Sequence, residues 1–89
     1  TCIILLSGRE DKYRPVTCSW LLDKKVPWDG LFMRPTDDKR HDDIVKQEIY
    51  EREIAGKYNV LFVIDDRQRV VDMWRSLGLV CFQVDYGAF

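Results

Sequence analysis

Two adjacent carboxylates, Asp65 and Asp66, directly follow the apolar stretch 60–64. Neighbouring like charges are unfavourable unless a cation neutralises them or one of them takes up a proton. Oxygen ligands select a hard cation, and Mg²⁺ binds through one or two carboxylates together with substrate phosphate. The pair therefore predicts a magnesium site. The alternative is that Asp66 caps a helix that begins just after it, and the two interpretations are compatible.

Residues 7–9 carry three groups that can bind a phosphate. These groups are the hydroxyl of Ser7, the unhindered backbone N–H of Gly8 and the guanidinium of Arg9. Hydroxyls, backbone amides and planar guanidinium groups are the usual donors to phosphate oxygens. The segment is therefore a candidate phosphate site, and the alternative is an ordinary turn between a strand and a helix with Arg9 on the surface.

Lys46 follows Asp42 by four residues, so both side chains lie on the same side of a helix. This spacing predicts a lysine that a carboxylate directs towards a phosphate. The alternative is an exposed ion pair worth about 0.2–0.5 kcal/mol. His41 is the only histidine, and no serine or cysteine is placed by spacing as its nucleophile, so we expect it at the surface.

Strand and helix patterns alternate along the chain in the order β-α-β-α-β-α-β. We expect strands at residues 2–6, 31–33, 60–64 and 79–84, and helices at about 14–25, 42–54 and 70–77. Apolar runs without alternation suit parallel strands that are buried on both faces. The pattern predicts a parallel sheet with helices on both faces, a three-layer α/β/α fold.

Ligands bind such sheets beyond the carboxyl ends of the strands. The candidate phosphate donors, the acidic pair and the lysine all come to that edge in the predicted fold. Together they describe phosphoryl transfer by positioning and electrostatics. No residue of the chain, however, is placed as the nucleophile that attacks phosphorus.

Composition limits the remaining possibilities. The 89 residues suffice for one domain, and 14 Lys and Arg against 15 Asp and Glu give a net charge of −1. That balance, with 46% apolar residues, excludes a disordered tail and a basic module held to nucleic acid by bulk charge alone. No apolar run approaches the roughly 18–20 residues of a membrane span. Three tryptophans are expected to anchor the core: Trp20, Trp28 and Trp74.

The three cysteines, Cys2, Cys18 and Cys81, are odd in number and lack C-x-x-C spacing. A disulfide framework or a zinc site is therefore not expected. Cys2 and Cys81 lie in apolar runs and should be inert. Reduced thiols and the absence of a signal peptide predict a cytoplasmic, intracellular protein.

Four stretches of the sequence resemble one family in the same order. They are residues 5–10 (LLSGRE), 39–46 (KRHDDIVK), 64–67 (IDDR) and 70–75 (VVDMWR). They are similar to the phosphatase domain of bacteriophage polynucleotide kinase/3′-phosphatase, within the haloacid dehalogenase (HAD) superfamily. The similarity runs through nearly all 89 residues, and the ordered set is specific. It implies a single HAD-like, Rossmann-like phosphatase domain over residues 1–89.

The resemblance implies a Mg²⁺-dependent phosphatase, a hydrolase that acts through an aspartyl-phosphate. By the family pattern Ser7 binds the phosphate, Gly8 lies beside it, and Arg9 is a helper specific to this family. Lys46 takes the place of the family's phosphate-contacting lysine, and Asp42 resembles the acidic residue that orients it. The implied substrate is a nucleic-acid 3′-phosphate end, as in nucleic-acid repair, or a nucleoside phosphate.

The same pattern assigns the metal most directly to Asp66, with Asp65 as an indirect or water-mediated partner. The family's Asp-x-Asp nucleophile motif, which precedes the serine motif, does not occur in this chain. We therefore expect a C-terminal fragment of a larger domain that lacks the nucleophile and the central strand of the sheet. Such a fragment should be inactive alone and should self-associate or accept a complementing N-terminal segment.

Two other classes of protein compete with this interpretation. One is a noncatalytic interaction module that binds phosphate or Mg²⁺ with the same fold. Retained Mg²⁺-dependent phosphate release would separate the enzyme from such a module. The other is the opening of a receiver domain, but only 23 residues follow Asp66, too few for the later strands that a receiver needs.

Overall fold

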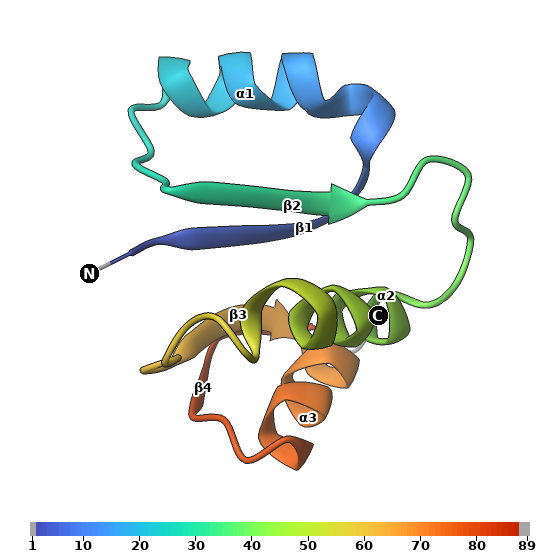
Figure 1. Cartoon of the computed structure of the whole chain (residues 1–89), viewed down its shortest axis with the longest axis vertical. Coiled ribbons are helices and arrows are strands. Elements are labelled where there is room, and N and C mark those ends of the chain that lie inside the picture. The colour runs from blue at the N-terminus through green and yellow to red at the C-terminus, as the bar shows by residue number, and fades with distance from the viewer. Residues whose placement is uncertain (1, 88–89) are drawn as a thin grey trace. The chain divides into compact units, whose positions relative to one another are not determined.

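A computed structural model describes residues 2–87, with the side chains of residues 85–87 left undescribed (Figure 1). The chain divides into two compact units, Thr1–Arg40 and His41–Phe89. Each unit contains one two-stranded parallel sheet and its helices. No helix among the described residues is long and apolar enough to cross a membrane.

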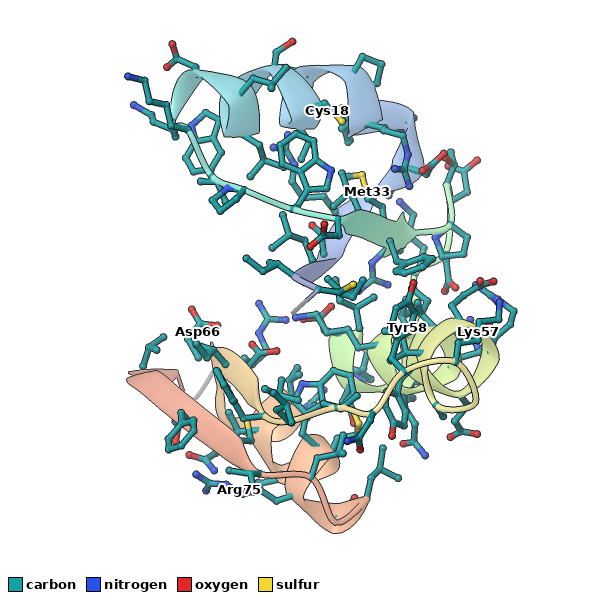
Figure 2. The ribbon with its side chains drawn as sticks, turned by 60° about the vertical axis from the view of Figure 1, so that its left-hand side comes forward. Cys18, Met33, Lys57, Tyr58, Asp66 and Arg75 are labelled. Carbon is teal, nitrogen blue, oxygen red and sulfur yellow. The ribbon has the colours of Figure 1, made fainter. Side chains whose placement is uncertain are left out.

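The first unit follows the predicted order of strand, helix and strand. Its elements are β1 (Ile4–Glu10), a 3₁₀ turn (Asp11–Tyr13), α1 (Arg14–Asp23) and β2 (Gly30–Arg34). β1 pairs in parallel with β2, with the Leu5 position opposite Leu31 and that of Ser7 opposite Met33. α1 covers one side of this pair, and Met33 points from β2 towards it (Figure 2).

β1 is longer than the sequence predicts. The predicted strand ends at Leu6, whereas β1 continues to Glu10 with a shift of register between Ser7 and Glu10. The Nε of Arg34 donates to the carbonyl oxygen of Gly8 at 2.7 Å, which holds the irregular end against β2. The candidate phosphate residues therefore lie on a bulged strand end, a place where side chains are commonly re-aimed.

The helix predicted near residue 14 is present, with Pro15 in its first turn, but Trp20, a predicted core anchor, is not buried. Thr17 and Leu21 are buried, whereas Val16 and Trp20 are 55% and 57% exposed. Thr17 and Leu21 are four residues apart, and so are Val16 and Trp20. Helical periodicity alone therefore does not decide which of these two neighbouring faces is buried. The prediction that Trp20 anchors the core is wrong for this reason.

The second unit contains two consecutive helix-to-strand connections. Its elements are α2 (Asp42–Ile49), a π-helical turn (Tyr50–Ile54), β3 (Val63–Arg67), α3 (Gln68–Ser76) and β4 (Cys81–Gly87). β3 pairs in parallel with β4, with Asp65 opposite Gln83. The strand predicted at 60–64 thus begins at Val63 and takes in the acidic pair.

Apolar side chains of α2 and α3 form the core of the second unit. Val45, Ile49, Val70 and Val71 are at most 2% exposed, and Trp74 is 3% exposed. Burying each such aliphatic side chain contributes about 1.5–3 kcal/mol. Trp74 is therefore confirmed as a core anchor, whereas Ile44 on α2 is 46% exposed and does not belong to the core.

Gly78 follows the last turn of α3 and ends the helix. Its φ is 83°, the left-handed region that glycine adopts without penalty. The N–H of Leu79 donates to the carbonyl oxygen of Trp74 at 3.2 Å, and that of Gly78 donates to Arg75 at 3.0 Å. These two bonds form a Schellman motif and satisfy carbonyls that the helix end leaves without partners.

The predicted α/β class, the alternating order of elements and the parallel pairing are confirmed. The described residues form two separate sheets, β1–β2 and β3–β4. A three-layer arrangement around one sheet stays a prediction.

Candidate functional site

Lys46 lies between two carboxylates in the second unit. Its Nζ is 3.2 Å from Oδ2 of Asp65 and 3.5 Å from Oδ2 of Asp42. The side chains of the three residues are 10%, 11% and 12% exposed. The alternative of an exposed ion pair is therefore wrong, because the charges are largely removed from water and depend on one another.

Asp65 has both of its carboxylate oxygens engaged. Oδ2 accepts a hydrogen bond from Nε1 of Trp74 at 3.2 Å in addition to the one from Lys46. Oδ1 accepts the backbone N–H of Asp66 at 2.9 Å. Trp74 packs edge-on against Tyr50 at 5.6 Å between ring centres, which fixes the indole in place. Asp65 is thus a fixed, inward-facing carboxylate.

Asp66 has the opposite environment. Successive side chains of a strand point to opposite sides, and Asp66 is exposed where Asp65 is not. Asp66 is labelled in Figure 2. Nε2 of Gln83 donates to the backbone carbonyl oxygen of Asp66 at 3.0 Å, which holds its backbone. Arg67, not Asp66, occupies the N-cap of α3, so the helix-cap alternative is wrong.

The described side chains around Asp66 are compatible with Mg²⁺. Among residues 2–84, whose side chains the structure describes, no three acidic, histidine or cysteine side chains gather as a metal cage. Mg²⁺ typically keeps several waters and uses one or two carboxylates with substrate phosphate. An exposed Asp66 beside a fixed Asp65 could hold the ion in that manner.

Ser7, Gly8 and Arg9 lie together at the bulged end of β1 in the first unit. The backbone N–H of Arg9 donates to Oγ of Ser7 at 3.1 Å, so the hydroxyl is oriented by its own segment. Arg9 itself is exposed. The segment therefore presents a hydroxyl and a guanidinium from one short stretch of backbone.

Arg34 is the residue that the sequence analysis left out. Besides its bond to Gly8, its Nη1 donates to the carbonyl oxygens of Asp38 at 3.0 Å and Arg40 at 2.6 Å. One guanidinium thus ties the bulge of β1 to the loop that follows β2. Its position at the carboxyl end of a predicted strand was the available clue, but that clue does not distinguish a binding residue from a structural one.

Glu10 connects the same segments through charge. The backbone N–H of Asp37, at 2.9 Å, lowers the pKa of the Glu10 carboxyl, burial opposes this, and the cations of Lys12 and Lys39 lower it further. The side chains of Lys12 and Lys39 approach Glu10 to 3.6 and 3.4 Å. The end of β1 is therefore surrounded by positive charge.

Asp38 is held ionised in the neighbouring turn. Hydrogen bonds from the side chain and backbone of Arg40 lower the pKa of Asp38 to about 2. The side-chain bonds reach both carboxylate oxygens, with Nη2 of Arg40 at 2.7 Å from Oδ2. The turn after β2 thus has a fixed shape that depends on one ionised carboxyl.

The predicted site residues fall into two groups. Asp42, Lys46, Asp65 and Asp66 come together in the second unit, and the 7–9 segment forms the other group in the first unit. The phosphate-binding and metal-binding roles of the two groups stay predictions. The expectation that His41 lies at the surface is confirmed, and its Nδ1 contacts Nη1 of Arg69.

The parallel strand–helix–strand units place the chain among α/β domains. The family model described as the polynucleotide kinase PNKP phosphatase domain matches residues 1–89. The chain belongs to this family.

The relatives are much longer than this chain. A protein of Autographa californica nuclear polyhedrosis virus, named as a bifunctional polynucleotide kinase/RNA ligase, is 40% identical over 80 residues, covering 86% of this chain and 11% of that protein. Two structures of the Pnkp1/Rnl/Hen1 complex, one titled an RNA repair complex, contain chains that are 53% identical with TM-scores of 0.96. The alignments cover 99% of this chain and 29% and 31% of those chains.

Proposed function

We propose that this chain contributes to a Mg²⁺-dependent phosphatase that removes the 3′-phosphate from nucleic-acid ends or from a nucleoside phosphate. The proposal rests on one observation, that Asp65 and Asp66 have opposite environments. Asp65 is fixed inward by Lys46 and Trp74, while Asp66 is exposed at the end of β3. This is how a sheet edge would offer one carboxylate to a metal and keep the other as support.

The phosphate-binding roles follow from the groups that each residue offers. The Ser7 hydroxyl, the Gly8 N–H and the Arg9 guanidinium would donate to phosphate oxygens, and Lys46 would add positive charge. Asp42 and Asp65 would hold the Lys46 ammonium in one position. A Mg²⁺ ion held by Asp66 would neutralise phosphate charge. The fold implied is the three-layer HAD arrangement.

No group in these 89 residues is proposed as the nucleophile. The sequence contains no Asp-x-Asp, and each carboxylate of the site already has another role. We therefore expect the 89-residue chain alone to bind phosphate without turnover. This observation also favours the second candidate, a noncatalytic module that binds phosphate or Mg²⁺.

The proposed partners are nucleic-acid ends, in line with relatives named for polynucleotide kinase and for an RNA repair complex. A complementing N-terminal segment or a second copy of the chain is the further partner that we propose. The described cysteines are free thiols, which suits the reducing cytoplasm.

The test uses the complete open reading frame that encodes this chain. Inorganic phosphate release is measured from a 3′-phosphorylated oligonucleotide, its 5′-phosphorylated isomer and a nucleoside 3′-monophosphate, with Mg²⁺ or with EDTA. The proposal predicts release only with Mg²⁺ and not from the 5′ isomer. Tight binding of the 3′-phosphorylated end without release would support the noncatalytic module instead.

A further inference from the structure

Two cations lie over the ring of Tyr13, directly after β1. The guanidinium carbon of Arg9 is 5.5 Å from the ring centre, and Nζ of Lys12 is 5.4 Å from it. The Tyr13 side chain is 44% exposed, so the ring is not part of the core. We call these three residues the Tyr13 surface. Packing in the core therefore does not explain why two cations lie over this exposed ring.

The side chains of Arg9 and Lys12 have fewer and longer polar contacts than the neighbouring arginines Arg14 and Arg34. Arg14 donates to Leu31 and Asp11, and Arg34 donates to three backbone carbonyls. Among the described residues none accepts a hydrogen bond from the Arg9 guanidinium, and Lys12 pairs with Glu10 only at 3.6 Å. Exposed cation–π contacts are worth only about 0.5–1 kcal/mol, so a ligand can displace them.

The charge of the chain is unevenly divided. The residues of the first unit include eight Lys and Arg against six Asp and Glu, a net charge of +2, and those of the second unit have a net charge of −3. The overall value of −1 conceals this difference. The Tyr13 surface thus lies on the unit to which a polyanion is attracted.

We propose that the Tyr13 surface binds the single-stranded nucleic acid next to the reacting 3′ end. A base stacks on the Tyr13 ring in place of the Lys12 ammonium, which then pairs with a backbone phosphate. Aromatic rings beside basic side chains are the elements with which proteins hold single strands of any sequence. Because Arg9 also belongs to the candidate phosphate segment, the surface begins where the terminal phosphate is held. This placement rests on the proposed function.

A consequence for specificity follows. A nucleoside monophosphate has only the reacting phosphate and one base, so it has no neighbouring nucleotide to place on Tyr13. A polynucleotide end has both a stacked base and a further phosphate for this surface. The Tyr13 surface therefore favours polynucleotide ends over mononucleotides.

Two other residues serve as matched controls. Tyr58 is 43% exposed and lies in the second unit, close to the exposure of Tyr13. Lys57 pairs with Glu53 at 3.6 Å, the same distance as Lys12 to Glu10. Both are labelled after the π-helical turn in Figure 2. The variants are Tyr13→Leu and Lys12→Gln, with Tyr58→Leu and Lys57→Gln as controls.

The experiment measures binding without reaction. Fluorescence anisotropy of the complete protein with a single-stranded oligonucleotide that ends in a 3′-hydroxyl gives Kd at several salt concentrations. Tyr13→Leu should weaken binding at least about fivefold, while Tyr13→Phe, which keeps the ring, retains it. Lys12→Gln should reduce the slope of log affinity against log salt by about 0.7. Thermal unfolding confirms that each variant is folded.

Two results of the binding measurement would overturn the proposal. One is wild-type affinity in Tyr13→Leu, and the other is an equal loss in Tyr58→Leu. In the phosphatase assay, Tyr13→Leu should lower the ratio of kcat/KM for the 3′-phosphorylated oligonucleotide to that for the nucleoside 3′-monophosphate, and an unchanged ratio contradicts the proposal. If the protein releases no phosphate, the proposed function fails while the binding measurement still decides the strand-binding surface.

Discussion

The side chain of Lys46 shows how the site and the core depend on each other. Its ammonium is shared by Asp42 and Asp65, and replacing it with methionine leaves two largely buried carboxylates without their main cation. We expect Lys46→Met to lower the free energy of unfolding by about 3–5 kcal/mol, as for other broken buried pairs. Nη1 of Arg67 lies 3.8 Å from Oδ2 of Asp42 and still offers this carboxylate a cation, so we expect a loss at the lower end of this range.

Urea unfolding of the two proteins measures this cost. Lys57→Met is the control, because Lys57 is 62% exposed in its pair with Glu53 and surface pairs contribute little. A loss below about 1 kcal/mol in Lys46→Met would place Lys46 with ordinary surface pairs and contradict the description of the site.

Asp38 gives the chain a pH-dependent contribution to stability. Its folded-state pKa of about 2 lies below the ordinary value of 3.8, so the ionised form stabilises the fold above pH 3.8. That contribution is lost as the pH falls through about 2. We therefore expect Asp38→Asn to lower the Tm at pH 7, with the difference from wild type shrinking below pH 4.

Thermal unfolding between pH 7 and pH 2 measures the difference in Tm between Asp38→Asn and the wild type. Asp23→Asn, at the exposed end of α1, is the control and should show no such convergence. A Tm difference for Asp38→Asn that stays constant down to pH 2 contradicts the assigned hydrogen bonds with Arg40.

At the residue level the sequence predicts the members of the site better than their contacts. The acidic pair and the Asp42–Lys46 spacing were visible, because strand ends and i, i+4 positions are local features. That Asp65 faces Trp74 depends on the packing of α3 against β3, which no local pattern contains. Arg34 was missed because its three carbonyl partners are brought together only by the fold.

At the level of elements, two glycines allow a sharp comparison. Gly78 has a φ of 83°, and a Cβ there would meet nothing within 4 Å, so the cost of alanine is purely conformational. Gly56 is equally open, but its φ is not in the positive range. We expect Gly78→Ala to destabilise by about 1–2 kcal/mol. Gly56→Ala should be neutral or stabilise by up to about 1 kcal/mol.

Chemical denaturation of Gly78→Ala, Gly56→Ala and the wild type gives the free energies of unfolding that test this expectation. Equal free energies of unfolding for Gly78→Ala and wild type would show that the Schellman motif does not require a left-handed residue at this position. The comparison isolates backbone conformation, because neither substitution creates a clash.

Element types were predicted well and orientations less well. The prediction of α3 is correct because Val70, Val71 and Trp74 recur at helical spacing and Gly78 follows the last turn. In α1 the apolar residue Leu21 is buried, whereas Val16 and Trp20 lie outside although they are more apolar than the buried Thr17. Helical periodicity predicts that a face exists, but tertiary packing decides which of two adjacent faces is buried.

The second unit, taken by itself, exposes apolar surface that a stable monomer rarely shows. On β3, β4 and the residues before them, Phe62, Ile64, Val80, Phe82 and Val84 are all more than 50% exposed. Sheets of two strands are marginal by themselves, and their unpaired edges accept further strands. We therefore expect the isolated 89-residue chain to self-associate through these edges.

Sedimentation equilibrium of the isolated chain at about 0.1 mM tests this expectation, because edge pairing depends on concentration. The average mass should exceed that of the 10.6 kDa chain and rise with concentration. A single monomer mass with cooperative thermal unfolding would show instead that the chain closes its own edges.

Phosphate release by three variants of the complete protein tests the central claim most directly. Asp66→Asn should lower kcat/KM for a 3′-phosphorylated oligonucleotide with Mg²⁺ by at least about 100-fold at an unchanged Tm, because a metal contributes several kcal/mol to the transition state. Asp65→Asn should lose both activity and stability, since it weakens the contact with the Lys46 cation. Asp72→Asn, exposed on α3, should change neither. Wild-type turnover in Asp66→Asn would contradict the assignment of the metal to this carboxylate.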